Sequence, residues 1–220
     1  FILFAAPPTQ DLEWSDSGIE GAHRFINKFF RLVTGFVDLK KGANVSKIDT
    51  SILNEEQSSV RQKTHLALQK VGDDFGRRHS FNTAIATMME LNNSISRFDD
   101  ASEQGMAIKQ EAIEIMVKCL SPVVPHVCHH LWLLLGGERA VVDSSWPKVD
   151  ESALVQENVQ IIAQVNGKLR AKIMAPLDSE NQTIQEIALA DEKIEKFTTN
   201  KQILKVIVVP NKLINIVVKD

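Results

Sequence analysis

The chain has 220 residues, of which 44% are hydrophobic and 24% are charged. This composition is typical of folded globular proteins, and no apolar run approaches the roughly 18–20 residues that span a bilayer, so no membrane segment is expected. The formal net charge of −3 at pH 7 argues against a general nucleic-acid coat protein, although it allows a local basic patch.

The first part of the chain is predicted to be helical. Residues 1–16 are interpreted as the tail of a preceding helix, a Pro-Pro break and a loop, so the sequence is expected to be a piece excised from a longer chain. From Ser17 apolar residues recur every three or four positions, which predicts a long helix followed by a loop over 39–53. The same periodicity, with start signals at Asn54 and Ser80, predicts further helices over 54–78, 80–98, 108–120 and 125–135. Residues 17–137 are therefore expected to form a bundle of four or five helices.

The periodicity changes after Gly137. Residues 138–156 show no sustained period and are expected to be a linker. Asn166-Gly167 between the alternating runs QIIAQV and KLRAKI predicts a β-hairpin with a type I′ turn. A helical stretch at about 179–198 and a second hairpin around Pro210-Asn211 follow. The expected fold class is α+β multidomain: a mainly α-helical bundle, then a small α+β domain with two hairpins over 157–220.

The first hairpin carries an alternation of cations and apolar residues. If 168–173 is a strand, successive side chains point to opposite faces. One face would carry Leu169, Ala171 and Ile173, and the other Lys168, Arg170 and Lys172. The cations would be about 6.6 Å apart, close to the spacing of phosphates along a nucleic-acid strand. The alternative is that exposed strands carry Lys and Arg to stay soluble and to block edge pairing.

Charge is distributed unevenly along the chain. Residues 157–220 contain nine basic and eight acidic residues, so this part carries +1 and the rest −4. Arg77-Arg78, at the end of a predicted helix, is a second candidate for phosphate contact, and compensation of the helix dipole is the alternative. Tyr is absent and most Phe lie on the apolar stripes, which favours recognition of backbone and shape over stacking on bases.

Neither a metal site nor a catalytic residue is expected. His126 and His130 in PHVCHHLW are one helical turn apart, as in zinc proteases, but Val127 stands where those enzymes need a glutamate. Cys119 and Cys128 are too few for a structural zinc site and indicate a reducing, cytoplasmic environment. The sequence also has no Gly-rich phosphate loop and no G-x-S-x-G motif.

Several strings together resemble bacterial leucyl-tRNA synthetases, and they occur in the order of that family. They are DLEWSDSGIEGAHRFINKFFRLV (11–33), RHSFNTAIATMMELNN (78–93), SPVVPHVCHHLW (121–132), SSWPKVD (144–150) and QVNGKLRAKI (164–173). The resemblance implies that 1–16 is the tail of the catalytic-core segment, 17–137 an anticodon-binding domain and 157–220 a C-terminal domain that reaches the outer corner of the tRNA. The family's HIGH and KMSKS signatures and its editing domain are absent, and His129-His130 replaces two acids that the family usually has.

The resemblance also implies a function. The full-length enzyme would attach leucine to its tRNA with ATP and Mg²⁺, as a cytoplasmic monomer, and the present chain would position tRNA beside the missing catalytic domain without activity or a cofactor of its own. The residues expected to contact tRNA are Lys168, Arg170, Lys172, Lys205 and Lys212 in the small domain, and Arg24, Lys28, Arg31, Arg77 and Arg78 in the bundle. The alternative is a helical protein-interaction module that binds no RNA.

Overall fold

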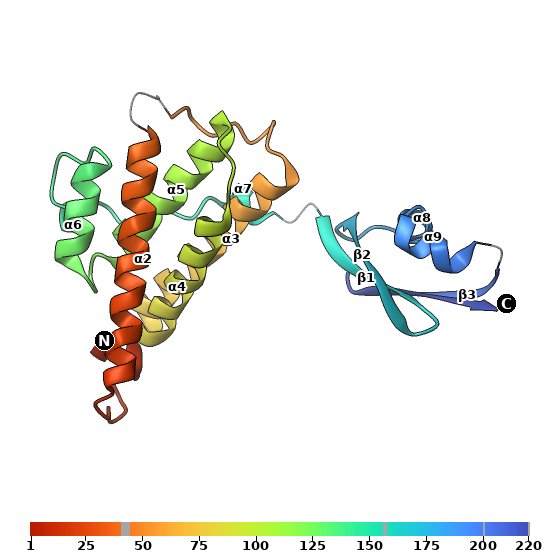
Figure 1. The fold of residues 1–220 in the computed structure, drawn as a ribbon, viewed down its shortest axis with the longest axis horizontal. Coiled ribbons are helices and arrows are strands. Elements are labelled where there is room, and N and C mark those ends of the chain that lie inside the picture. The colour runs from red at the N-terminus through yellow and green to blue at the C-terminus, as the bar shows by residue number, and fades with distance from the viewer. Residues whose placement is uncertain (41–44, 156–157, 200, 220) are drawn as a thin grey trace. The chain divides into compact units, whose positions relative to one another are not determined.

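The computed structural model describes residues 1–40, 45–155, 158–199 and 201–219. The chain divides into two compact units, Phe1–Leu154 and Val155–Asp220. Figure 1 shows that the first unit is a helix bundle and that the second combines a small sheet with helices. The expected fold class, a helical bundle followed by a small α+β domain, is therefore confirmed.

The first unit is built from helices, most of them close to the predicted ranges, but the helix predicted over 108–120 begins at Glu103 and a further short helix lies inside the expected linker. The helical elements are α1 (Ile2–Ala5), α2 (Asp16–Lys40), α3 (Glu55–Asp73), a π-helical turn (Asp74–Arg78), α4 (Phe81–Arg97), α5 (Glu103–Leu120), α6 (Pro125–Leu134), a 3₁₀ turn (Val141–Asp143) and α7 (Glu151–Leu154). The predicted loop over 39–53 begins later than expected because α2 continues to Lys40, and residues 41–44 of that prediction lie outside the described residues.

Helix α3 begins at the residue that the sequence marks as its cap. The Asn54 side chain accepts a hydrogen bond from the backbone N–H of Gln57 at 2.9 Å, and the Gln57 side chain accepts one from the Asn54 backbone at 2.9 Å. This reciprocal pair satisfies two donors that the first turn leaves free. The apolar stripes of the helices then meet in one core, whose largest fully buried side chains include Phe29, Phe36, Leu68, Met88, Ile95, Ile108, Ile113, Met116, Leu120 and Leu131.

The segment expected to be a linker, 138–156, is attached to the bundle over most of its length. Trp146 meets Phe75 edge-on, with ring centroids 6.0 Å apart. The Asp150 carboxylate accepts a hydrogen bond from Arg61 at 2.6 Å, and the Asp150 backbone N–H donates to His65 Nδ1 at 3.1 Å. The first unit accordingly extends to Leu154. The segment shows no sustained helical period because only Val141–Asp143 and Glu151–Leu154 are helical, and individual side chains hold the rest to the bundle.

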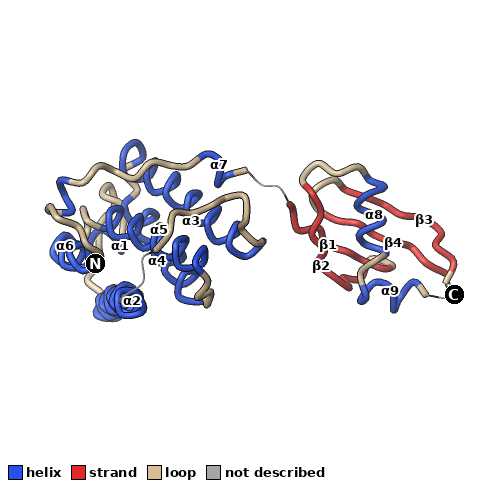
Figure 2. Tube along the Cα trace, turned by 90° about the horizontal axis from the view of Figure 1, so that it is seen from above, coloured by secondary structure: helices blue, strands red, loops and turns tan. Residues whose placement is uncertain are grey.

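The second unit is a four-stranded sheet with two helices on one face (Figure 2). Its elements are β1 (Asn158–Val165), β2 (Lys168–Pro176), α8 (Asn181–Leu189), α9 (Glu192–Thr198), β3 (Gln202–Val209) and β4 (Leu213–Lys219). Both predicted hairpins are present as antiparallel pairs, and β1 and β4 pair in parallel to give the order β2-β1-β4-β3. Ile161, Ile173, Ile184, Ile194 and Ile216 are buried between the sheet and the helices.

The turn between β1 and β2 has the expected conformation. Asn166 and Gly167 both have positive φ, 50° and 74°, as a type I′ turn requires. The Asn166 side chain has a second role, because its Nδ2 donates to the Val218 carbonyl at 3.1 Å and its Oδ1 accepts from the Val218 N–H at 2.9 Å. The turn residue thus extends the pairing of β1 with β4 by one step.

Candidate nucleic-acid interface

Strand β2 contains a β-bulge at Arg170. Ala163 pairs with Ala171 and Gln164 pairs with Leu169, so Arg170 is an extra residue with no partner in the ladder. An extra residue of this kind shifts the alternation of side chains along the strand, so residues before and after Arg170 no longer point to the faces expected from simple alternation. Leu169 is 56% exposed, whereas Ala171 and Ile173 are buried. The expectation that Leu169 shares a face with Ala171 and Ile173 is therefore wrong.

The bulge also separates the three cations that were expected to share one face. Lys168 lies opposite Val165, which faces the core, whereas Lys172 lies opposite Ile162 on the open face of the sheet. Arg170 turns toward the helices, where its guanidinium carbon is 3.9 Å from the centroid of the Phe197 ring on α9. The single cationic face predicted for Lys168, Arg170 and Lys172 is thus wrong, because one inserted residue reverses the alternation.

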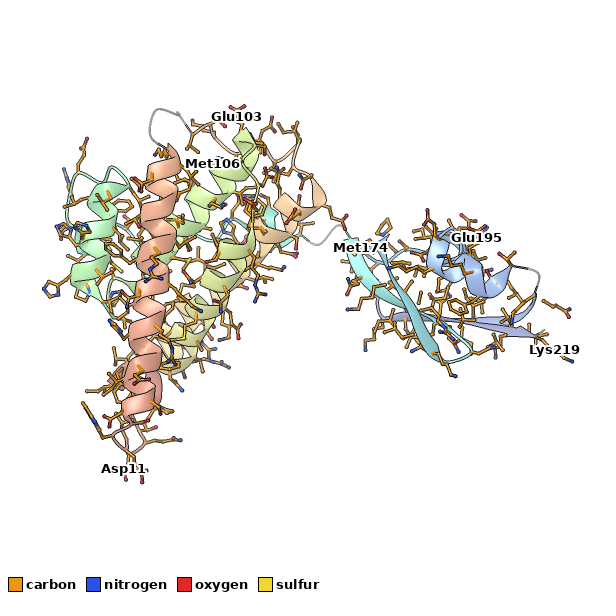
Figure 3. The ribbon with its side chains drawn as sticks, viewed as in Figure 1. Asp11, Glu103, Met106, Met174, Glu195 and Lys219 are labelled. Carbon is orange, nitrogen blue, oxygen red and sulfur yellow. The ribbon has the colours of Figure 1, made fainter. Side chains whose placement is uncertain are left out.

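The open face of the sheet carries one of the predicted cations on each of its two opposite edge strands. Lys172 is on β2, and Lys205 is on β3, opposite Val217 of β4. The edge strands also expose the apolar side chains of Leu169, Ile207 and Met174, whose side chain Figure 3 labels. The two strands between them add polar residues to this face, namely Gln160, Gln164 and Asn215. Lys212 lies in the turn between β3 and β4 and is exposed. This face can therefore contact a polyanion through scattered cations rather than through a continuous stripe.

Three of the five predicted cations of the bundle are paired with acids. Arg24 is 3.7 Å from Glu20, one turn away on α2. Arg77 makes two hydrogen bonds to Asp73, at 2.6 and 2.9 Å, and they lower the pKa of the Asp73 carboxyl below its ordinary value. Arg78 is 3.2 Å from the same carboxylate. Because these charges are locally balanced, the three residues are weaker candidates for phosphate contact than Lys28 and Arg31.

Lys28 and Arg31 line a hollow of about 580 Å³ in the first unit. Arg97, at the end of α4, and Lys109, on α5, line it as well. We call this hollow the cationic groove and define it by Lys28, Arg31, Arg97 and Lys109. No acid is among the described residues that line it. Arg97 and Lys109 were not among the residues predicted from the sequence, because they come from separate helices and no local pattern marks them.

The described residues form neither a cluster of metal ligands nor a reactive cysteine site. Within 1–40, 45–155, 158–199 and 201–219, no three His, Cys, Asp or Glu residues are grouped so that they could hold a metal ion. Cys119 and Cys128 are unpaired and buried, and burial raises the pKa of each thiol to about 12. Both thiols are therefore protonated near neutral pH and act as apolar core groups. None of the described helices is long and apolar enough to cross a membrane.

Comparison with known families identifies the family to which this part of the chain belongs. Residues 58–189 match the family model described as the anticodon-binding domain of tRNA ligase, which is more than half of the chain. The chain belongs to this family. Two relatives of this anticodon-binding region, both called leucine–tRNA ligase, come from Ruthia magnifica subsp. Calyptogena magnifica and Alcanivorax borkumensis. They are 53% and 48% identical over 100% and 99% of the chain.

The anticodon-binding region also resembles a solved structure. A crystal structure of the ternary complex of Agrobacterium radiobacter K84 agnB2 LeuRS with tRNA and LeuAMS matches with a TM-score of 0.69 and 28% identity. The match covers 100% of this chain and 28% of that chain. The chain likewise spans only 27% and 26% of the length of the two relatives named above.

Proposed function

We propose that this chain is the tRNA-binding C-terminal part of a leucine–tRNA ligase, a cytoplasmic enzyme that attaches leucine to its tRNA with ATP and Mg²⁺. The observation that carries the proposal is the similarity to leucine–tRNA ligases along the whole chain, at 53% identity with one of them. The resemblance to LeuRS in a complex with tRNA supports tRNA as the partner. Catalysis and editing belong to the rest of the enzyme, so the chain alone is expected to be inactive and to act beside that catalytic body in a monomeric enzyme.

Within this proposal the two units contact tRNA through separate sets of cations. In the second unit these are Lys168, Arg170, Lys172, Lys205 and Lys212, and in the first they include Lys28 and Arg31. Phosphate contacts fix position and orientation without reading sequence. Lys172 and Lys205 stand on opposite edge strands of the sheet, and this separation favours contact with backbone and shape over a run of successive phosphates.

A binding titration tests the proposal. The chain is titrated with leucine tRNA and with an unrelated tRNA at 50 and 200 mM salt, and each lost phosphate contact should reduce the slope of log affinity against log salt by about 0.7–0.9. The Lys172→Gln/Lys205→Gln variant should bind leucine tRNA about tenfold more weakly at low salt. Arg24→Gln/Arg77→Gln is the matched control, because both arginines are exposed and paired with acids.

The outcomes of this titration separate the alternatives. Steep salt dependence and a control variant close to wild type support tRNA binding. Binding that is absent or independent of salt would overturn the proposal and favour a protein-interaction module. An aminoacylation assay with the chain alone, expected to yield no leucyl-tRNA, tests the assignment of catalysis to the rest of the enzyme.

A further inference from the structure

The turn between β1 and β2 contains a chemically reactive pair of residues. Asn-Gly occurs once in the sequence, at Asn166-Gly167. In such a pair the backbone nitrogen of the glycine can attack the side-chain amide carbon of the asparagine, because glycine has no Cβ to obstruct the approach. Asparagine is accordingly among the thermolabile residues. Asn166 and Gly167 are both exposed, so the water that completes the reaction can reach them.

The reaction of this pair is deamidation. The Gly167 nitrogen loses its proton to a solvent base and forms a bond to Asn166 Cγ. The bond from Cγ to Nδ2 breaks, and the departing nitrogen takes up a proton and leaves as ammonia. Water then opens the cyclic imide at one of its two carbonyls, which gives aspartate or isoaspartate in place of the asparagine. Water is the only other reactant, so the reaction needs no oxidant or reductant.

The folded structure holds both reacting groups in hydrogen bonds to β4. The Gly167 N–H donates to Asn215 Oδ1 at 3.0 Å, so the proton that has to leave is bound. Val218 holds the Asn166 amide at both ends, because Nδ2 donates to its carbonyl at 3.1 Å and Oδ1 accepts from its N–H at 2.9 Å. Separate residues of β4 thus fix the nucleophile and the carbon that it must attack. The reaction requires that these three hydrogen bonds open first.

Asn211 is a natural comparison within the same unit. It lies in the turn between β3 and β4 and has positive φ, 58° against 50° at Asn166. Its side chain also makes two hydrogen bonds, both with Asp178. The residue after it is Lys212, whose Cβ obstructs the approach of its own backbone nitrogen. The two turns are therefore alike in conformation and differ in reactivity.

We propose that Asn166-Gly167 is a deamidation site that β4 protects, and that this site becomes reactive when the end of β4 detaches. The inference goes beyond the proposed function and does not depend on it, because its readout is a chemical change at one residue. The product would loosen β4 in turn, since a carboxylate has no N–H to donate to the Val218 carbonyl. Isoaspartate would also add a carbon to the backbone of the turn. A transient opening of β4 would therefore become a permanent loss of this contact.

The first experiment compares deamidation in the folded and the unfolded chain. The chain is incubated in mildly alkaline buffer with or without concentrated guanidinium chloride, and peptide mapping by mass spectrometry follows the exchange of amide NH₂ for OH. Because three hydrogen bonds must open, Asn166 should react about a hundredfold more slowly in the folded chain. In denaturant Asn211 should react far more slowly than Asn166. Equal rates for Asn166 in the two conditions, or equal rates for the two asparagines in denaturant, would overturn the inference.

The second experiment removes one of the three hydrogen bonds. Asn215→Ala removes the acceptor of the Gly167 N–H, so Asn166 should deamidate about fivefold faster in the folded variant than in wild type. Asp191→Ala is the matched control, because its side chain accepts two backbone hydrogen bonds at the start of α9, elsewhere in the same unit. The control should react as slowly as wild type. An unchanged rate in Asn215→Ala would contradict protection by β4, and so would an equal increase in both variants, because it would indicate reaction from the unfolded unit.

A third measurement tests the effect of the product on β4. Asn166→Asp supplies the carboxylate directly, and the Val218 amide should then exchange its hydrogen about fivefold faster than in wild type. Asn211→Asp is the control and should leave the exchange of this amide unchanged, because its hydrogen bonds go to Asp178. Wild-type exchange at Val218 in Asn166→Asp would contradict the loosening of β4 by deamidation.

Discussion

Arg61 Nη2 donates to Asp150 Oδ2 across 2.6 Å and so joins α3 to a residue 89 positions later in the chain. The same guanidinium donates through Nε to Glu111 on α5 at 3.1 Å, although Arg61 is only 6% exposed. One buried cation therefore holds two acids from distant segments. Removal of this cation is costly mainly at Glu111, whose side chain is only 24% exposed, whereas the Asp150 side chain is 42% exposed and keeps its hydrogen bonds from Ser152.

Replacement of Arg61 by leucine should lower the free energy of unfolding of the first unit by about 3–5 kcal/mol. The reason is that half-buried Glu111 then loses its guanidinium partner and keeps only the contact with His65, at 3.3 Å. Urea denaturation followed by tryptophan fluorescence measures the loss, because Trp14, Trp132 and Trp146 all lie in the first unit. Arg24→Leu is the control: its pair with Glu20 is exposed, so the change should be below about 0.5 kcal/mol. Equal effects of the two substitutions would contradict a structural role of the Arg61 contacts.

The same contacts predict loss of stability in acid. Hydrogen bonds from Ser152 and Arg61 hold the pKa of Asp150 below its ordinary value. Burial alone would raise the pKa of Glu111, but the contacts with His65 and Arg61 together lower it. Because these folded-state values lie below the unfolded ones, about 4, the stabilisation is complete above about pH 5 and is lost as pH falls through the folded values.

A pH series of urea denaturations between pH 3 and 7 measures this acid dependence. The free energy of unfolding should fall steadily below about pH 4.5, and Asp150→Asn should make that fall shallower. An identical acid profile in the Asn variant would show that other carboxylates dominate.

The stacking of Arg170 on Phe197 predicts that these two residues stabilise the second unit. Arg170→Ala should lower the stability of this unit by about 1 kcal/mol, because it removes a cation–π contact and the cover of the side-chain stem. Lys172→Ala, on the open face, should change it by less than about 0.5 kcal/mol. Because the two units need not unfold together, hydrogen exchange of the β1 and β2 amides is the suitable measurement. Equal protection in both variants would contradict the stacking role.

The side chain of Asn166 should contribute to the stability of the second unit, in addition to the turn conformation that this residue adopts. Asn166→Gly keeps the positive φ but removes both hydrogen bonds to Val218, so we expect a loss of about 1–2 kcal/mol. Asn211→Gly is the matched control, because Asn211 also has positive φ, at 58°, and also makes two hydrogen bonds, to Asp178, but in an exposed place. The control should lose less stability, and the reverse order would contradict the role of Asn166.

Local signals in the sequence were sufficient for the elements of the fold. Asn54 followed by an acidic turn marked the start of α3, and Asn166-Gly167 marked the first hairpin, since both depend on residues close in sequence. The bulge at Arg170 could not be predicted in this way. Its position is set by how β2 pairs with β1, and a shift of one residue moves side chains to the opposite face.

The candidate site was predictable only in part, for the same reason. Lys28 and Arg31 are one turn apart and could be recognised as one basic surface of α2, but Arg97 and Lys109 join them only when α4 and α5 pack in the bundle. Conversely, Arg77 and Arg78 were predicted as candidates for phosphate contact, and the fold pairs both of them with Asp73. Whether a charged residue can belong to a binding surface depends on its neighbours in the folded structure, and many of these are distant in the sequence.

The parallel pairing of β1 with β4 affects how the second unit folds during synthesis. Ile162 of β1 pairs with Leu213 of β4, about 50 residues later in synthesis. Until β4 leaves the ribosome, β1 has an unpaired edge and the apolar residues Ile161 and Ala163 lack part of their cover. Contacts so distant in sequence form slowly, so this is the interval in which the nascent chain is open to aggregation or to a chaperone. Substitutions in β4 should therefore reduce the yield of soluble protein before any effect on tRNA is seen.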